Sequence, residues 1–326
     1  MLLDGCDENA VAQAADRLAA GELVGFPTET VYGLGARADD DAAVAKVFAA
    51  KGRPVDHPLI VHVTDAAAAR PFAAEWPAVA QRLCAAFWPG PLTVIVLRRP
   101  GMAAASAAGQ DSIGLRCPAH PVAQALLRAA AQRGVAGVAA PSANRFGRIS
   151  PTQALHVVEE FGDALLVLEG GACEGGIEST IVDCSRGRPV LLRPGVLTLA
   201  QLEAAAGEPV HARDAAAPRA SGTLEAHYAP RAKLRLMTSD ALRAALQVPG
   251  RPPLKLAVYS RTVPKSAAPG VNHRVMPMQA VQAANELFST LRELDAEGAH
   301  LIWVEEPPAT PEWAGVRDRL QRAAAS

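Results

Sequence analysis

The chain has 326 residues, half of them hydrophobic, and a formal net charge of −1 at pH 7. This length predicts two domains, and the hydrophobic content is enough for a sizeable core, which argues against a disordered protein. Charges of both signs are spread along the chain, so the net charge favours neither nucleic acid nor an anionic membrane as a partner.

The cysteines and the apolar segments narrow the class of protein further. The five cysteines include no CxxC pair and no Cys/His cluster with the spacing of a zinc site, so we expect no zinc. The N-terminus lacks the pattern of a signal peptide, and no apolar stretch approaches the length that spans a bilayer. These features predict a cytoplasmic protein with no membrane partner.

The first two thirds of the chain alternate helical and strand-like segments. Apolar spacing predicts helices over residues 7–20, 40–50, 78–87, 121–132 and 152–160. Short apolar runs predict strands over residues 23–26, 59–63, 92–97, 113–116, 137–140, 164–168, 180–184 and 190–192. The last strands follow one another as closely as antiparallel neighbours do. We therefore expect a mixed α/β sheet with flanking helices.

A polar segment without periodicity, residues 207–230, follows this region and predicts a linker, which could be ordered over a site. Beyond it, strands are expected over residues 233–237, 254–260 and 300–306, and helices over 240–247, 279–295 and 311–323. This pattern predicts a smaller second α/β domain, and it carries no catalytic motif. The predicted boundaries are 1–206, 207–230 and 231–326.

The motif PTETVYGLG, residues 27–35, follows a predicted buried strand. It offers the hydroxyls of Thr28, Thr30 and Tyr32 and the carboxylate of Glu29, and its two glycines let the backbone approach a ligand. This set suits a small polar substrate. The alternative is an ordinary turn between a strand and a loop.

The motif KGRP, residues 51–54, ends the second predicted helix. Lys51 and Arg53 would point toward one ligand if the chain leaves helical geometry at Gly52, as Pro54 encourages. The alternative is a solvated basic helix end.

Two further motifs could hold an anion. PSAN, residues 141–144, and Ser150 offer hydroxyls, an amide and helix N-terminal NH groups, and GGACEGGIEST, residues 170–180, adds glycines and hydroxyls. The alternatives are a turn with Ser150 as a helix N-cap, and a flexible loop. Taken singly, His62 could also be an ordinary histidine of a strand, and Arg116 and Arg193 could also be surface arginines.

Several motifs that would indicate other chemistry are absent from the sequence. There is no Walker A loop, no HExxH and no GxSxG, and GLGARAD lacks the last glycine of a dinucleotide fingerprint. P-loop ATPases, zinc proteases, serine hydrolases and Rossmann dehydrogenases lose support, and we expect no redox cofactor.

Taken in order, eight motifs resemble the Sua5/YrdC/YciO family, and specifically its two-domain Sua5 type. They are PTETVYGLG, KGRP with HPL, WPGPLT, LRCPAHP, APSANRFGRISPT, GGIESTIVD, LLRPG and HYAP. They cover roughly residues 8–230, and the C-terminal segment agrees in size and position. The resemblance implies a YrdC-like mixed twisted sheet with flanking helices, followed by a smaller Rossmann-like Sua5 domain.

The resemblance also implies a reaction. Such proteins join L-threonine, bicarbonate and ATP with Mg²⁺ into threonylcarbamoyl-AMP and release pyrophosphate. A downstream complex then transfers the threonylcarbamoyl group to adenosine 37 of tRNAs that read ANN codons. Whether this chain binds tRNA directly stays open.

Residue roles follow from the matching motif positions. The resemblance implies that Lys51 and Arg53 are catalytic, by neutralising charge at the α-phosphate of ATP. The residues implied to surround threonine are Thr30, Tyr32, His62, Arg116, Ala140 and Ser179. Those implied to face ATP are Arg53, His57, Ser112, Ser142, Asn144, Ser150, Arg193, His227 and Tyr228. HYAP resembles a family segment that folds over the nucleotide, which predicts a lid. At position 57 the sequence departs from the family pattern, because His57 stands where the family often has asparagine.

Two rival functions remain at this point. One is an RNA-binding or ribosome-associated module, which the near-zero net charge and the lack of a basic run disfavour. The other is a carbamoyl-transfer enzyme that uses carbamoyl phosphate, whose further catalytic modules are absent from this sequence.

Overall fold

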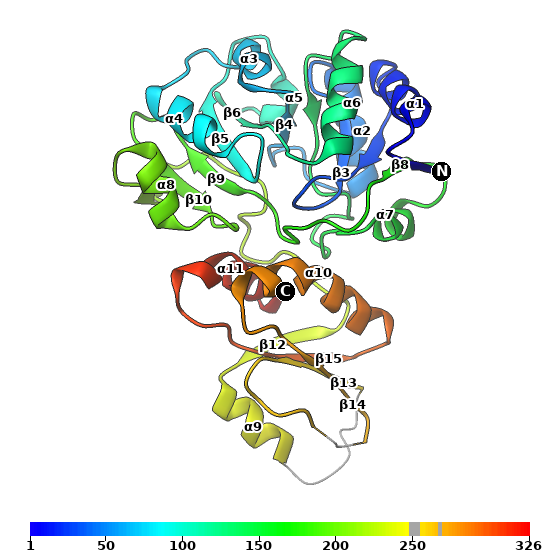
Figure 1. Cartoon of the computed structure of the whole chain (residues 1–326), viewed down its shortest axis with the longest axis vertical. Helices are drawn as coiled ribbons and strands as arrows, with labels where there is room; N and C mark the ends of the chain where they lie inside the picture. Colours follow the sequence, from blue (N-terminus) through cyan, green and yellow to red (C-terminus); the bar gives the residue numbers. More distant parts are fainter. Residues whose placement is uncertain (248–254, 267–268) are drawn as a thin grey trace. The chain divides into compact units, whose positions relative to one another are not determined.

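The computed structural model describes residues 1–247, 255–266 and 269–326, which form two compact units, each a sheet with helices (Figure 1). The first unit comprises Met1–Phe146 and Ser150–Thr223, and the second comprises Gly147–Ile149 and Leu224–Ser326. This division differs from the predicted boundaries in two ways. Much of the segment expected to be a linker belongs to the first unit, and the short segment Gly147–Ile149 belongs to the second.

The first unit is built on a sheet whose eleven strands stand in the order β1-β8-β2-β3-β7-β4-β6-β5-β9-β10-β11. The strands are β1 (Leu2–Asp4), β2 (Val24–Phe26), β3 (Gly33–Arg37), β4 (Ile60–His62), β5 (Leu92–Leu97), β6 (Ser112–Arg116), β7 (Val138–Ala139), β8 (Leu166–Glu169), β9 (Thr180–Asp183), β10 (Val190–Arg193) and β11 (His211–Ala212). The β4/β6 and β5/β9 pairs are parallel, whereas β2/β3, β5/β6 and β9/β10 are antiparallel. The predicted mixed sheet is confirmed.

Helices flank this sheet, and side-chain caps set where several of them begin. They are α1 (Glu8–Ala19), α2 (Asp41–Lys51), α3 (Ala66–Ala69), η1 (Arg70–Phe72), α4 (Ala78–Phe87), α5 (Ala104–Ala107), α6 (Pro121–Ala131), α7 (Ala154–Phe161) and α8 (Leu199–Ala206). The carboxylate of Asp40 accepts from the NH groups of Ala42 and Ala43 and so begins α2. Gly52, with a φ of 62°, ends α2 in the left-handed conformation that glycine adopts without strain.

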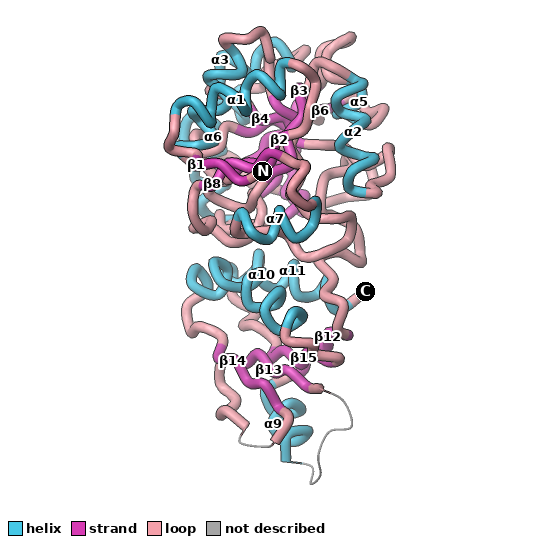
Figure 2. The backbone as a smooth tube through the Cα atoms, turned by 90° about the vertical axis from the view of Figure 1, so that its right-hand side faces the viewer, coloured by secondary structure: helices cyan, strands magenta, loops and turns pink. Residues whose placement is uncertain are grey.

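Alternating side chains of the inner strands pack on different helices. Leu166 and Leu168 of β8 lie in one cluster with α1 and α6, which run side by side in both views (Figures 1 and 2). Val167 lies in another cluster, with Val157 of α7. Because successive strand residues point to opposite faces, this alternation places helices on both faces of the sheet.

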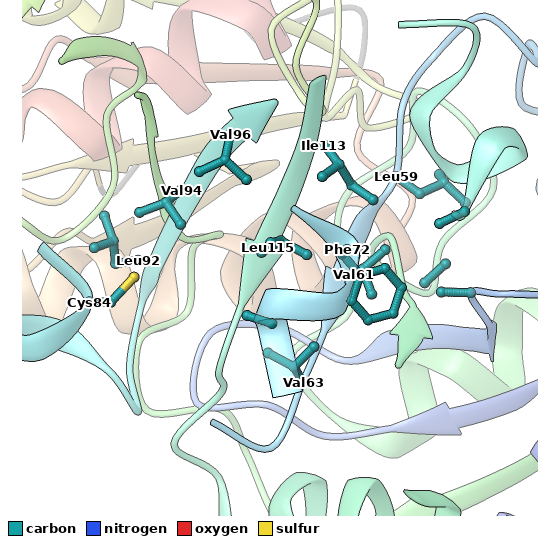
Figure 3. Close-up of a cluster of buried hydrophobic side chains, with 14 of the residues drawn as sticks. Leu59, Val61, Val63, Phe72, Cys84, Leu92, Val94, Val96, Ile113 and Leu115 are labelled. Carbon is teal, nitrogen blue, oxygen red and sulfur yellow. The ribbon is translucent and has the colours of Figure 1, made fainter. Parts of the chain in front are cut away.

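The central strands β4, β5 and β6 contribute many side chains to the larger part of the core (Figure 3). Figure 3 shows the ring of Phe72 beside Val61. A Cβ atom at Gly137 would lie 2.8 Å from that ring and 2.8 Å from the side chain of Val61. The close approach of Phe72 therefore requires glycine at position 137.

Several elements of the first unit were not predicted. The glycine-rich end of PTETVYGLG continues as β3, because the ring of Phe26 packs where side chains at Gly33 and Gly35 would stand. The helix α8 and the short strands β1 and β11 were also missed. The interpretation of Ser150 as an N-cap was wrong, since α7 begins at Ala154 with Gln153 as its cap residue.

The second unit has a four-stranded parallel sheet in the order β12-β15-β13-β14. Its elements are β12 (Lys233–Met237), α9 (Ser239–Gln247), β13 (Leu256–Ser260), β14 (Val271–Val275), α10 (Ala280–Ala296), β15 (Leu301–Glu305), η2 (Pro311–Trp313) and α11 (Ala314–Ala324). Helices α10 and α11 cover one face of the sheet and α9 the other (Figure 2). The predicted small α/β domain is confirmed. Strand β14 was missed, and residue 254 of the predicted strand 254–260 lies outside the described residues.

None of the helices in the described part of the chain is both long and apolar enough to cross a membrane.

Truncating Leu115 should destabilise the first unit, because this fully buried residue of β6 lies at the centre of the core in Figure 3. Leu115→Ala should lower the free energy of unfolding by about 2–5 kcal/mol. A urea titration followed by hydrogen exchange of the β5 and β6 amides measures this change. The matched control is Leu155→Ala, at a residue 58% exposed, which should change the value by no more than about 0.5 kcal/mol. Equal effects of the two variants would contradict this account of the core.

Candidate active site

Most of the candidate residues stand where elements of the first unit end. His62 ends β4 and Arg116 ends β6, and the two are paired in register on neighbouring parallel strands. Ala140 follows β7, which pairs with β4 on its other side. Ser179 precedes β9, and its hydroxyl lies 2.8 Å from that of Thr93 on β5. The order of the strands therefore gathers residues that are far apart in the sequence.

A buried ion pair joins the first motif to the end of β6. Nη2 of Arg116 donates to Oε1 of Glu29 at 2.6 Å, and the NH of Ala119 donates to the other carboxylate oxygen at 2.9 Å. Burial alone would raise the pKa of Glu29, but the charge and hydrogen bond of Arg116 hold it below its ordinary value. Nε of Arg116 is buried and has no hydrogen-bond partner among the described residues. Arg116 is therefore a buried site arginine and not the surface residue of the alternative interpretation.

His62 is buried beside this ion pair, and its ring meets that of Phe26 edge to face at 6.1 Å. Burial, and next the positive charge of Arg116, lower the pKa of His62 to about 3. The imidazole is thus neutral at physiological pH. Its buried Nδ1 has no partner within the described part of the structure, so this ring is not fully satisfied by the strand around it.

The hydroxyls of the first motif have fixed directions. Thr28 Oγ1 donates to the carbonyl of Val31 at 2.7 Å, so the hydrogen between Thr28 and Thr30, whose hydroxyls are 2.8 Å apart, comes from Thr30. This leaves the lone pairs of the Thr30 oxygen as acceptors. Tyr32 is fully buried, and its OH lies 2.8 Å from the carbonyl of Gly171 and accepts from the NH of Gly170 at 3.2 Å. The Tyr32 hydroxyl thereby ties the motif to the glycine-rich loop after β8.

Lys51 points into the protein at the end of α2. It is 3% exposed, and Nζ donates to the carbonyl of Ser142 at 2.5 Å and to that of Asn144. Burial, and then the neighbouring charge of Arg53, lower the pKa of Lys51. The Lys51 amine therefore holds the backbone of the PSAN loop. The alternative interpretation, a basic helix end exposed to solvent, does not apply to this buried lysine.

The chain leaves helical geometry at Gly52, as the sequence predicted. Arg53 bonds to other groups than the two carbonyls that Lys51 binds, and a ligand shared by both cations stays a prediction. Nη2 of Arg53 donates to the carbonyl of Pro58 at 3.0 Å and to the hydroxyl of Ser221 at 3.3 Å. Its guanidinium lies 5.8 Å from the ring of Phe146, which also contacts the ring of His57 at 5.4 Å.

Arg193, at the end of β10, also bonds to Ser221, the residue that Arg53 contacts. It is buried, and Nε and Nη2 donate to the carbonyl of Ser179 at 3.1 and 2.8 Å. Nη1 donates to the carbonyl of Ser221 at 2.8 Å. The hydroxyl of Ser150, another residue predicted to face ATP, donates to the carboxylate of Glu178 at 2.5 Å.

A pocket lies over the face of the central strands in the first unit. Its floor includes the apolar side chains Ile60, Ile95 and Ile181, and Ser112 adds a hydroxyl; Gln110, Arg219, Ala220 and Ser221 line it as well. Its lining thus combines apolar side chains with polar groups.

His227 and Tyr228 belong to the second unit and not to the first. Tyr228 has a φ of 63°, which is uncommon for a residue with a side chain. Its ring stacks on that of Phe288 at 5.3 Å, and the guanidinium of Arg319 lies 5.4 Å from it. Packing within the second unit therefore fixes this conformation.

The described residues include no group of three or more His, Cys, Asp or Glu side chains that could hold a metal ion. Sequence reasoning offered Glu29 as a group for a small polar substrate but not as the partner of Arg116, and it gave no role to Thr93 or Gln110. Of these residues, only Glu29 stands out in the sequence, because it is the one charged residue of its motif.

Comparisons with known proteins cover both units. A family model described as telomere recombination, of the Sua5, YciO and YrdC proteins, matches residues 16–195. A second model, for the C-terminal domain of threonylcarbamoyl-AMP synthase, matches residues 197–325.

Individual relatives match along nearly the whole chain. Threonylcarbamoyl-AMP synthase of Bacillus subtilis is 37% identical, over 96% of this chain and 92% of its own. The Pyrococcus abyssi protein of the same name is 34% identical, over 97% and 94%. The crystal structure of P. abyssi Sua5 complexed with L-threonine superposes with a TM-score of 0.88 at 33% identity, over 98% of this chain and 95% of that one. The chain therefore belongs to the Sua5/YrdC/YciO family, in its two-domain Sua5 form.

Proposed function

We propose that this chain is a threonylcarbamoyl-AMP synthase, a nucleotidyltransferase that joins L-threonine, bicarbonate and ATP and releases pyrophosphate. The observation that carries the proposal is the similarity, along nearly the full length, to two relatives of that name. The P. abyssi structure that holds L-threonine also superposes on both units.

The buried residues around Arg116 offer groups that match those of threonine. The guanidinium would take the carboxylate of the amino acid, because arginine is the side chain best suited to bind a carboxylate in a buried site. The neutral ring of His62 and the acceptor oxygen of Thr30 would meet the hydroxyl of threonine. Ser179 and the small side chain of Ala140 would complete the surroundings.

ATP would bind along Arg53, Arg193 and the PSAN loop. Its base would enter the pocket whose floor is formed by Ile60, Ile95 and Ile181. We propose that Mg²⁺ arrives with ATP as the substrate complex, held mainly by phosphate oxygens, as is usual for this ion.

The proposed reaction has two bond-forming steps. The amino nitrogen of threonine bonds to the carbon of bicarbonate, and water leaves to give a carbamate. A carbamate oxygen then attacks the α-phosphorus of ATP, the bond from that phosphorus to the bridging oxygen breaks, and pyrophosphate leaves. No side-chain nucleophile is needed.

Charge repulsion is the main obstacle to the second step. At ~4 Å, two unit negative charges near a protein surface repel by about 4 kcal/mol. Arg53 would offset this repulsion directly. Lys51 would do so from beneath the PSAN loop, whose shape it fixes through the carbonyls of Ser142 and Asn144.

Measuring pyrophosphate tests the proposal. Release should require threonine, bicarbonate and ATP together, and carbamoyl phosphate should not replace bicarbonate. If the chain instead binds RNA with a steep salt dependence and releases no pyrophosphate, the RNA-binding alternative is favoured. In the cell, we propose that the product passes to a separate complex that modifies adenosine 37 of tRNA.

Removing either cation at the end of α2 should stop turnover while the chain stays folded. Lys51→Ala and Arg53→Ala should each lower kcat at least about a hundredfold, the usual scale for losing an electrostatic catalytic group. Steady-state pyrophosphate release measures kcat, and circular dichroism checks the fold. Lys46→Ala is the matched control, because this exposed lysine lies on the same helix and bonds only to the carbonyl of Gly21 among the contacts described. Near-normal turnover in both test variants would refute the assignment.

His62 should make the first unit less stable in mild acid. Because its pKa falls from 6.5 to about 3 on folding, the unfolded chain takes up a proton below pH 6.5 that the folded chain does not. Stability should therefore decrease as the pH falls from 6.5 toward 3, by at most about 1.4 kcal/mol per pH unit from this group. His62→Gln removes the titrating ring. Urea titrations at pH 7 and pH 5 should show a smaller loss for the variant than for the wild type, and identical losses would contradict a neutral buried His62.

A further inference from the structure

We propose that Gln110 is a positioning residue for the nucleotide: its side-chain amide holds a strap, residues 217–223, over the base pocket. This inference rests on the proposed function. Neither the motifs nor the predicted site residues include Gln110, which lies on the connection between β5 and β6.

The amide of Gln110 makes two complementary hydrogen bonds to one backbone unit of the strap. The NH of Arg219 donates to Oε1 of Gln110 at 2.8 Å, and Nε2 of Gln110 donates to the carbonyl of Arg219 at 3.1 Å. Such a pair fixes both the position and the direction of the strap, as one rung of a sheet would. A single hydrogen bond would leave the strap free to rotate.

Hydrogen bonds to its backbone groups hold Gln110 in place. Its NH donates to the carbonyl of Ala107 at 3.1 Å, and its carbonyl accepts from Nε of Arg98 at 3.2 Å. The turn before it contains Ala108, with a φ of 52°, and Gly109, with a φ of 75°. A left-handed alanine is costly and persists only where its surroundings impose it. The side chain of Gln110 is thus presented by a rigid turn.

The strap forms one wall of the base pocket. Ala217 and Ala220 of the strap pack against the apolar cluster that includes Ile95 and Ile181. Arg219, Ala220 and Ser221 line the pocket together with Ser112. A shift of the strap along the sheet would therefore change the shape of the site that we propose for the base.

Further side chains anchor the strap. Arg219 itself donates to the carbonyl of Ala108 at 3.1 Å, and two arginines proposed to meet phosphate bind Ser221. Arg53 donates to the hydroxyl of Ser221 and Arg193 to its carbonyl. Phosphate oxygens would compete with Ser221 for these guanidinium donors, because charged acceptors form the stronger hydrogen bonds. Gln110 carries no charge, and its side-chain amide bonds to the backbone of Arg219. Its clamp is independent of the phosphates and keeps the strap in register when the arginines turn to ATP.

Substituting Gln110 tests the clamp in the full chain. Gln110→Ala should raise the KM for ATP about tenfold, as expected for two lost hydrogen bonds, and leave the KM for threonine within about twofold. Hydrogen exchange of the Arg219 amide should accelerate by about tenfold or more, both without ATP and with a non-hydrolysable ATP analogue. The half-buried position of Gln110 at the surface lets the variant fold.

Two further variants separate the clamp from other effects. Gln110→Glu keeps the acceptor but sets a carboxylate against the carbonyl of Arg219, so it should behave like Gln110→Ala. Gln132→Ala, at an exposed glutamine that ends α6, is the matched control and should change nothing.

An unchanged KM for ATP in Gln110→Ala would overturn the proposal, whether or not the Arg219 amide exchanges faster. Equal increases of the KM for both substrates would also overturn it, since they indicate a general disturbance. The exchange rates and the affinity for the ATP analogue do not need turnover. If the wild type released no pyrophosphate, the proposed function would fail, while these two measurements would still decide for or against the clamp.

Discussion

The pairing of buried cations with oxygens of the same chain is the constraint on which the site depends. A charge removed from water is tolerated only when it is paired and hydrogen-bonded. Lys51 meets this requirement with carbonyls of the PSAN loop, Arg116 with the carboxylate of Glu29, and Arg193 with the carbonyl of Ser179. Each pairing joins two segments that the sequence separates. The cations therefore shape the loops around them as well as contributing positive charge to the site.

The sheet brings these segments within reach of one another. In the order β7-β4-β6-β5-β9, five strands that follow a different order in the sequence lie side by side. Because β4 and β6 are parallel neighbours, the end of β6, with Arg116, lies next to the end of β4, with His62. A buried neutral imidazole beside a buried arginine follows directly from this register, because both desolvation and the adjacent positive charge disfavour protonation. The chemistry of the site is thus a consequence of strand order.

The second unit uses its own strand ends differently. In an open parallel sheet, ligands usually bind beyond the carboxyl ends of the strands. Here the buried carboxylate of Glu305, at the end of β15, accepts from the NH groups of Arg261 and Thr262, both at 2.7 Å. A side chain of the chain thus occupies the donors that could otherwise meet an anion. This agrees with the lack of a catalytic motif in that part of the sequence.

The sequence by itself determined the class of fold, most of the long helices and strands, and the motifs that identify the family. It could do so because amphipathic spacing, helix-breaking residues and short motifs are local properties of the chain. It did not reveal β3, since pairing with β2 and packing on Phe26 override the low strand preference of glycine. It also left open the alternative of Ser150 as a helix N-cap, which the structure removes, because α7 begins at Ala154 and the Ser150 hydroxyl bonds to Glu178. Only the tertiary structure decided that Glu29 pairs with Arg116, that Lys51 binds carbonyls, and that Gln110 clamps Arg219. These partners are 87, 91 and 109 positions apart, and no local pattern encodes which buried polar groups will meet at such separations once the sheet has formed.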